Sequence, residues 1–184
     1  MNLKSKKQKK GFTLIEMLVS MTVFVLIVSS ATGFFTSVLK AQRKLLATQE
    51  IFSQVSYLEE YVSRSIRMAR KDLAGVCISA RSNYSITHSG SGIKFLNYKG
   101  ECQEFYLYNS KLMESKNSVV SELTSSALTV DDFNINVLGN SQSDNIQPRV
   151  TLFINVTGSG TRTEEQAEVQ IQTTISQRKL DIQY

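Results

Sequence analysis

One long uncharged segment near the amino terminus limits what this chain can fold into. Residues 17–39 are 23 consecutive residues without a charged side chain. At 1.5 Å per residue, a helix of this length covers about 35 Å, which is enough to cross the hydrocarbon core of a bilayer. No other part of the sequence has this length and composition. We therefore expect one transmembrane helix, and the rest of the 184-residue chain is long enough for one folded domain.

The basic residues are unevenly distributed along the chain. Five lysines lie within the first ten residues, whereas the sequence from Gly11 onward contains 16 basic and 16 acidic side chains. Positive flanks of a transmembrane helix stay in the cytoplasm, so we expect a single-pass protein of the cytoplasmic membrane with an extracytoplasmic carboxy-terminal domain. The net charge of +5 therefore belongs to the leader, and composition gives no general support for binding of nucleic acid.

A cleaved secretory signal peptide is the alternative interpretation of this segment. Such signals have an apolar part of roughly 7 to 15 residues followed by a small-x-small site, for which Ser29, Ser30 and Ala31 would qualify. The apolar character continues beyond this site, at Gly33 and Phe34 and as far as residue 39. The length of the run favours a membrane anchor.

Composition also argues against an enzyme. The chain contains one histidine, two cysteines and no tryptophan, which leaves little material for a metal centre, a histidine-based triad or a redox motif. We interpret His88 as an exposed loop residue, and Asp131 and Asp132 as a solvated turn or edge. We therefore expect no catalytic residues, no metal site and no cofactor.

Glu16 is an acidic residue at the start of the apolar run. A carboxylate near the centre of a membrane helix costs about 2.5 to 3.5 kcal/mol, less near the interface, and such a residue needs a cationic partner. If the chain is cut between Gly11 and Phe12, the new α-amino group of Phe12 is that cation, either in the same chain or in a neighbouring copy. The alternative interpretation of Glu16 is an interfacial carboxylate on an ordinary signal anchor, with no role in assembly.

The residues around this position resemble a known processing signal. Residues 9–20, KKGFTLIEMLVS, are similar to the class III signal of type IV pilins and type II secretion pseudopilins. The resemblance implies that prepilin peptidase cuts after Gly11 and methylates the amino group of Phe12. It also implies that Glu16, the fifth residue of the mature chain, meets the terminal amine of an adjacent subunit during assembly. Many major pilins have a proline in the apolar half, whereas the weakest helix former in this region here is Gly33.

Beyond residue 39 the pattern becomes that of an amphipathic helix. Apolar residues recur every three or four positions: Ile51, Val55, Leu58, Val62, Ile66, Ala69 and Leu73. We expect one helix from Phe12 to about Asp72, with Gly75 as its stop. Its opposite face carries Glu60, Arg64, Arg67 and Lys71. These cations are either a contact for a neighbouring subunit or for DNA phosphates, or a solvated face that favours the helix carboxy terminus.

The last 110 residues have the composition of antiparallel β-structure. Alternating β-branched and aromatic residues predict strands over residues 76–80, 93–98, 103–108, 111–114, 128–138, 149–156 and 166–176. Residues 99–101 and 109–110 are expected turns, and residues 140–148 and 158–161 are expected loops. We therefore predict an α+β fold in which the long helix packs on an antiparallel β-sheet domain, as in pilins.

Cys77 and Cys102 are the only cysteines of the sequence. In the predicted topology both lie outside the cytoplasm, where a disulfide persists, and two cysteines allow a single intramolecular pairing. A bridge closing this loop would stabilise the domain by about 3.5 kcal/mol in the chain-entropy model. The alternative is two buried thiols.

These expectations define four segments and a role for the chain. We expect a cleaved leader at residues 1–11, a transmembrane and assembly helix at 12–39, an amphipathic helix at 40–74 and an extracytoplasmic β-rich domain at 75–184. The layout resembles minor pilins or pseudopilins of the J or W type, which help to initiate or cap a cell-surface or periplasmic filament. Implied partners are prepilin peptidase, other pilins, an inner-membrane assembly platform and membrane lipid. The alternative function is a binding module at the filament tip, either an adhesin or a receptor for DNA uptake.

Overall fold

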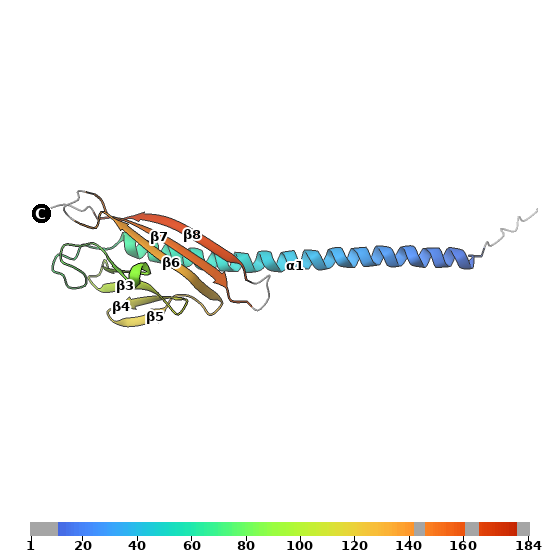
Figure 1. Cartoon of the computed structure of the whole chain (residues 1–184), viewed down its shortest axis with the longest axis horizontal. Coiled ribbons are helices and arrows are strands. Elements are labelled where there is room, and N and C mark those ends of the chain that lie inside the picture. The colour runs from blue at the N-terminus through green and yellow to red at the C-terminus, as the bar shows by residue number, and fades with distance from the viewer. Residues whose placement is uncertain (1–10, 142–145, 161–165, 180–184) are drawn as a thin grey trace, which may run out of the picture. The chain divides into compact units, whose positions relative to one another are not determined.

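The computed structural model describes residues 11–141, 146–160 and 166–179, and the first helix, α1, spans Leu14–Arg67 (Figure 1). The predicted leader at residues 1–11 lies outside the described residues except for Gly11. Contacts between Cα atoms divide the chain into two compact units, Met1–Gln42 and Arg43–Tyr184.

The amino-terminal unit contains the first part of α1. The helix begins at a side-chain cap: the carbonyl of Thr13 accepts the amide of Met17 at 3.2 Å, and the Thr13 hydroxyl accepts the amide of Glu16 at 3.3 Å. The apolar side chains that follow are exposed: the side chain of Leu14 is 85% exposed and that of Phe35 is 61% exposed. Within the described residues, α1 is the helix that is long and apolar enough to cross a membrane.

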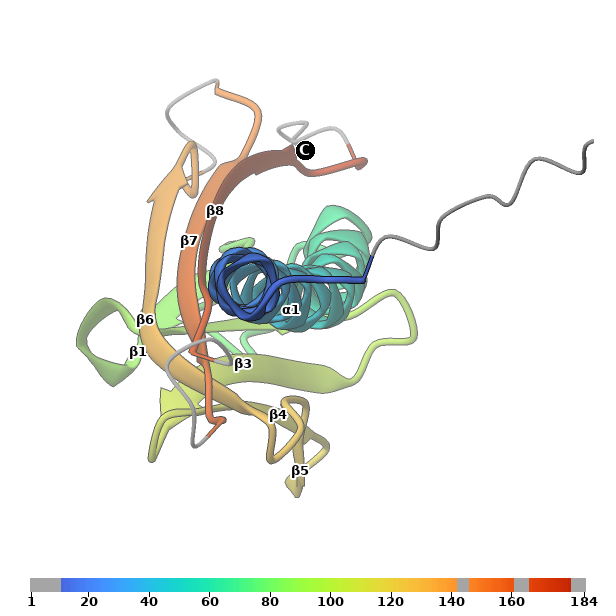
Figure 2. The ribbon, with the colours of Figure 1, turned by 90° about the vertical axis from the view of Figure 1, so that its right-hand side faces the viewer.

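In the carboxy-terminal unit, α1 contributes one face to the core. Ile51, Val55, Leu58, Val62 and Ile66 are buried, as the three-and-four spacing predicts. They pack with residues from two sheets, and β7 and β8 curve around one side of the helix (Figure 2). The predicted α+β fold, with a long amino-terminal helix packed on antiparallel sheets, is confirmed.

The first sheet is an antiparallel meander of five strands. Its members, in spatial and chain order, are β1 (Ser85–Thr87), β2 (Gly92–Leu96), β3 (Cys102–Tyr108), β4 (Lys111–Lys116) and β5 (Val119–Glu122). A 3-10 turn, η1 (His88–Gly90), connects β1 and β2. Asn109 and Ser110, between β3 and β4, both have positive φ, which is the geometry of a type I′ hairpin turn and confirms the predicted turn.

The second sheet is an antiparallel meander of three longer strands. These are β6 (Leu128–Leu138), β7 (Arg149–Gly158) and β8 (Glu168–Ser176). Alternate residues of β6 and β7 face the helix, and a shift in register between Val130 and Asp132 marks a β-bulge in β6. The sequence predicted each of these strands with boundaries that differ by at most two residues.

The end of α1 differs from the prediction. The helix ends at Arg67 instead of at about Asp72, and Leu73 is exposed. Tertiary partners take the last carbonyls: the Tyr84 hydroxyl donates to Ile66 O at 2.9 Å, and the Arg178 amide donates to Arg67 O at 2.8 Å. The chain then leaves the helical path, and Ala69 is buried outside the helix.

The predicted strand over residues 76–80 is wrong, because these residues form a loop around Asp72. The amides of Gly75 and Val76 donate to Asp72 Oδ1, and those of Cys77 and Ile78 donate to Asp72 Oδ2. Amides held by a carboxylate cannot form a β-ladder. The side chain of a residue outside the segment thus decides its backbone conformation.

Strands β1 and β5 were not predicted. β1 has only three residues, and β5 is exposed at all four positions, so neither shows the alternation that marks a half-buried strand. The sequence does contain a turn signal before β5, the pair Asn117 and Ser118. In the structure both residues have positive φ, as a tight hairpin turn requires. An Asn-Ser pair between two short polar runs is a turn signal that the periodicity of the strands does not reveal.

The predicted disulfide between Cys77 and Cys102 is confirmed. The two Cα atoms are 5.4 Å apart, within the usual range for a bridge. The bond joins the loop around Asp72 to the first residue of β3. It therefore fastens the segment that follows α1 to the five-stranded sheet.

Candidate functional site

The candidate processing site lies at the start of α1. Gly11 and Phe12 precede the helix and are exposed, with the Phe12 side chain 78% accessible. Thr13 is the capping residue, and Glu16 is the third residue inside the helix. The order Thr-x-x-Glu is that of a capping box, in which an acidic side chain also favours the positive end of the helix dipole.

Glu16 therefore also has a structural role, in the first turn of α1. Its carboxylate lies in the first turn, which is stabilising by itself. It has no ion-pair partner among the residues that the structure describes. Glu16 is exposed and is surrounded by apolar side chains. When lipid or other helices cover this surface, its charge needs a partner.

Six hydroxyl groups of the apolar half are satisfied inside the helix. Each donates to a backbone carbonyl three or four residues earlier: Ser20, Thr22, Ser30, Thr32, Thr36 and Ser37. Backbone and hydroxyl groups satisfied in this way are compatible with an apolar environment. Both Thr36 and Ser37 donate to Gly33 O, so the residue that the sequence marks as the weakest helix former also carries two extra hydrogen bonds.

The cations predicted on one helix face do not form one surface. Arg64 forms an ion pair with Glu60, with 3.2 Å between Nη2 and Oε1. Lys71 lies beyond the end of α1, and partial burial lowers its pKa. The helix ends too early to align Arg64 and Lys71 as the sequence pattern predicted.

The other polar residues singled out in the sequence are peripheral. His88 is exposed in η1 and stacks on Tyr106, with ring centroids 4.5 Å apart. Asp131 and Asp132 are exposed at the bulge of β6, where Asp131 accepts a hydrogen bond from Thr157. Within the described residues, no group of three His, Cys, Asp or Glu side chains could hold a metal ion.

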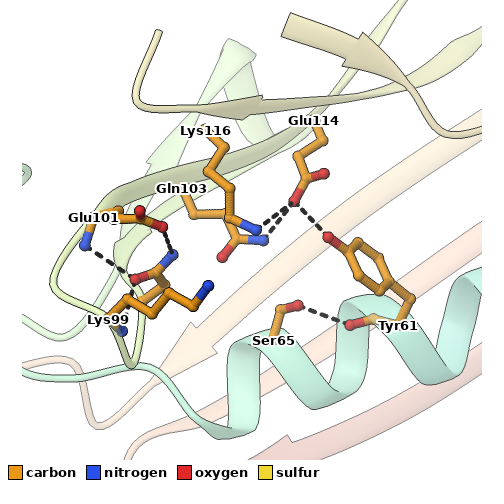
Figure 3. Close-up of polar contacts among 8 residues, drawn as sticks. Tyr61, Ser65, Lys99, Glu101, Gln103, Glu114 and Lys116 are labelled. Atoms are coloured by element: carbon orange, nitrogen blue, oxygen red, sulfur yellow. Dashed lines mark hydrogen bonds and ion pairs between the residues drawn. The ribbon is translucent and has the colours of Figure 1, made fainter. Parts of the chain in front are cut away.

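The structure adds a buried polar cluster that sequence reasoning missed (Figure 3). Tyr61 of α1 donates to Glu114 Oε1 of β4 at 2.8 Å, and Gln103 of β3 donates to the same oxygen at 2.6 Å. Glu114 is only 8% exposed, and Lys116 Nζ lies 3.9 Å from it. These residues are distant in the sequence, so periodicity alone could not bring them together. The cluster joins the helix to the five-stranded sheet.

Comparison with known proteins identifies the amino-terminal segment. Residues 6–32 match the family model of the prokaryotic N-terminal methylation motif, which is the signal of type IV pilins. No curated protein and no solved structure matches the chain. The match covers Gly11, Phe12 and Glu16, the three residues around the predicted cleavage site.

The motif has consequences for processing and location. It implies processing by prepilin peptidase and assembly with other pilins, and it suggests a structural protein. Together with the apolar helix it fits a single-pass anchor in the inner membrane. The methylation motif, the long amino-terminal helix and the antiparallel sheet domain fit a pilin-like protein.

Proposed function

We propose that this chain is a minor pilin or pseudopilin that helps to initiate or cap a type IV pilus-like filament. Cleavage between Gly11 and Phe12 exposes an α-amino group, which the peptidase methylates. The amino terminus enters assembly from the cytoplasmic side of the membrane, and the β-rich unit is displayed outside. Secretion, pilus and DNA-uptake machines all use subunits of this kind.

The observation that carries the proposal is the environment of Glu16. The side chains around it are exposed and apolar, so in a filament they must be covered by lipid or by neighbouring helices. The hydroxyl groups of Ser20 and Thr22, near Glu16, already donate to backbone carbonyls, whereas the carboxylate has no ion-pair partner among the described residues. The Phe12 amine of an adjacent subunit supplies the missing charge, which sets the axial register of the helices.

The test separates the charge of Glu16 from its place in the capping box. Glu16→Gln keeps a residue that is compatible with the capping box but removes the negative charge. We expect this variant to be cleaved and inserted into the membrane at normal levels but to be absent from sheared filaments, as measured by immunoblot. Glu16→Ala, which loses both features, should behave in the same way.

The matched control is Glu50→Gln, which removes an exposed carboxylate from the same helix. It should enter filaments normally. Normal entry of Glu16→Gln, with loss of Glu16→Ala alone, would show that the helix cap and not the ion pair matters, and would overturn the proposal.

A further inference from the structure

A groove of about 520 Å³ lies on the carboxy-terminal unit, away from the processing site in the sequence. Its walls are Met68, Arg70, Tyr98, Arg178 and Lys179. These residues come from three separate places: the segment after α1, the turn between β2 and β3, and the segment after β8. Only the tertiary structure places them beside one another.

Positive charge is concentrated around this groove. Three of the five residues that line it, Arg70, Arg178 and Lys179, are cationic, and none of the five is acidic. The rest of the unit compensates, because the sequence from Gly11 onward has equal numbers of basic and acidic residues. The sequence from Gly11 onward, which is neutral in total, thus has a cationic surface in this groove, where an anion would concentrate.

The cations of the groove are not used to complete the helix terminus. Backbone and neutral groups are used instead: the Arg178 amide donates to Arg67 O of the helix at 2.8 Å, and Gln177 Nε2 donates to Ala69 O, just beyond the helix, at 3.0 Å. The side chains of Arg70, Arg178 and Lys179 are exposed and form no ion pair with any described residue. Three guanidinium or ammonium groups therefore remain available to a ligand.

Tyr98 adds an aromatic surface to the groove. Its side chain is 55% exposed, and Lys99 Nζ lies 5.7 Å from the ring centroid. The turn that carries it is held by the buried Asn97, whose Oδ1 accepts the amides of Lys99 and Glu101 at 2.9 and 3.0 Å. The ring is thus presented on a fixed turn, which reduces the entropy lost on binding.

We propose that this groove binds single-stranded nucleic acid. Arg70, Arg178 and Lys179 contact phosphates, and Tyr98 stacks on an unpaired base. Cations that follow a backbone together with an exposed aromatic ring are what a single strand requires, whereas the bases of a duplex are already stacked on one another. The inference goes beyond a role in the filament and does not depend on cleavage or assembly.

The experiment measures binding of a fluorescent oligothymidylate of about 15 nucleotides, within the site sizes known for such grooves, to the full chain in detergent. We expect Tyr98→Ala to weaken binding at least about 5-fold, the lower limit for loss of one stacked base. We expect the double variant Arg70→Ala/Arg178→Ala to bind more weakly and to reduce the slope of log affinity against log salt by about 1.4, since each phosphate contact to a single strand contributes roughly 0.7.

Two matched controls account for nonspecific attraction, including that of the lysine-rich leader, which every variant retains. Arg43→Ala/Lys44→Ala removes two exposed cations from α1, and Tyr108→Ala removes an exposed tyrosine from the end of β3. Neither control changes a residue that lines the groove, so both should bind as the unmodified chain does. Thermal melting of each variant checks that the fold is retained.

Three results would overturn the proposal. The first is equal loss of affinity in the groove variant and in Arg43→Ala/Lys44→Ala, which means attraction by net charge alone. The second is equal affinity for an abasic phosphodiester of the same length, or no effect of Tyr98→Ala, which means that no base is recognised. The third is tighter binding of a duplex, or no binding of any of the three probes.

Discussion

Asp72 shows how one side chain determines the path of the segment after α1. It is 1% exposed, and its two carboxylate oxygens accept four backbone amides at 2.6 to 3.1 Å. Burial by itself raises the pKa of Asp72, but the four amide hydrogen bonds outweigh it, and the pKa is lowered. The charged carboxylate therefore stabilises the fold, and the loop it organises positions Cys77 for the disulfide.

We expect Asp72→Asn to lower the free energy of unfolding at neutral pH by at least about 2 kcal/mol, because an amide nitrogen cannot accept the hydrogen bonds of Cys77 and Ile78. The stability that depends on a lowered pKa is present above the ordinary value of 3.8 and is lost as the pH falls through the folded value. The difference between Asp72→Asn and the unmodified chain should therefore shrink in acid.

Denaturant unfolding of the full chain in detergent, followed across the pH range, measures this difference. Asp132→Asn is the control, because it removes an exposed carboxylate. A stability difference for Asp72→Asn that is the same at all pH values would contradict the role assigned to the charge.

At the scale of elements, polar and covalent links join α1 and its following segment to the five-stranded sheet. The disulfide joins Cys77 to the start of β3, and Tyr61 joins the helix to β4 through Glu114 (Figure 3). Burial, followed by the hydrogen bond to Glu114 and its charge, raises the pKa of Tyr61 to about 12. The neutral phenol is thus the form that the helix–sheet contact requires.

We expect Tyr61→Phe to destabilise the carboxy-terminal unit by about 1.5 to 3 kcal/mol, because it removes a hydrogen bond to a buried carboxylate. With a folded pKa near 12 and an ordinary value of 10.0, the folded state retains the proton longer, so the contribution of Tyr61 is lost as the pH rises between these values. The Tyr61→Phe variant should therefore lack this loss of stability at alkaline pH.

The measurement is thermal or denaturant unfolding between neutral and alkaline pH. Tyr108→Phe, at a 59% exposed position at the end of β3, should change neither the stability nor its pH dependence. An equal effect of both variants would mean that the phenol of Tyr61 contributes nothing specific.

At the scale of the whole chain, the two compact units differ in what covers their apolar side chains. The carboxy-terminal unit buries its apolar side chains in a core that α1 and both sheets share. The amino-terminal unit leaves its apolar side chains exposed. A surrounding membrane or neighbouring helices must therefore cover them. Processing at Gly11 is the event that would convert a membrane-anchored precursor into a subunit ready for assembly.

We expect the native polypeptide to begin at N-methylated Phe12, as measured by mass spectrometry of the mature amino terminus. Gly11→Val should retain the leader. A Cβ added at Gly11 meets no atom within 4 Å, so loss of cleavage in this variant would report recognition by the peptidase and not a damaged fold. A native chain that keeps its leader, or that begins at Thr32, would contradict the proposed function.

Local patterns in the sequence determined much of this protein. The uncharged run of residues 17–39, the three-and-four spacing from Ile51 to Ile66 and the alternation in β6 each arise from neighbouring residues, so a single segment reveals them. The apolar helix, its buried face and six of the strands could therefore be predicted, and the disulfide followed from the count of two cysteines. The processing signal is also local, because a peptidase recognises a continuous stretch of chain.

Tertiary contacts decided the rest. The helix ends at Arg67 because Tyr84 and Arg178 take its last carbonyls, and the cationic groove exists because the chain after β8 returns to that end of the helix. Gln177 and Ala69, which hold this return, are 108 residues apart. No local pattern encodes such a pairing, since its free energy comes from partners that lie far apart in the sequence and meet only in the folded chain.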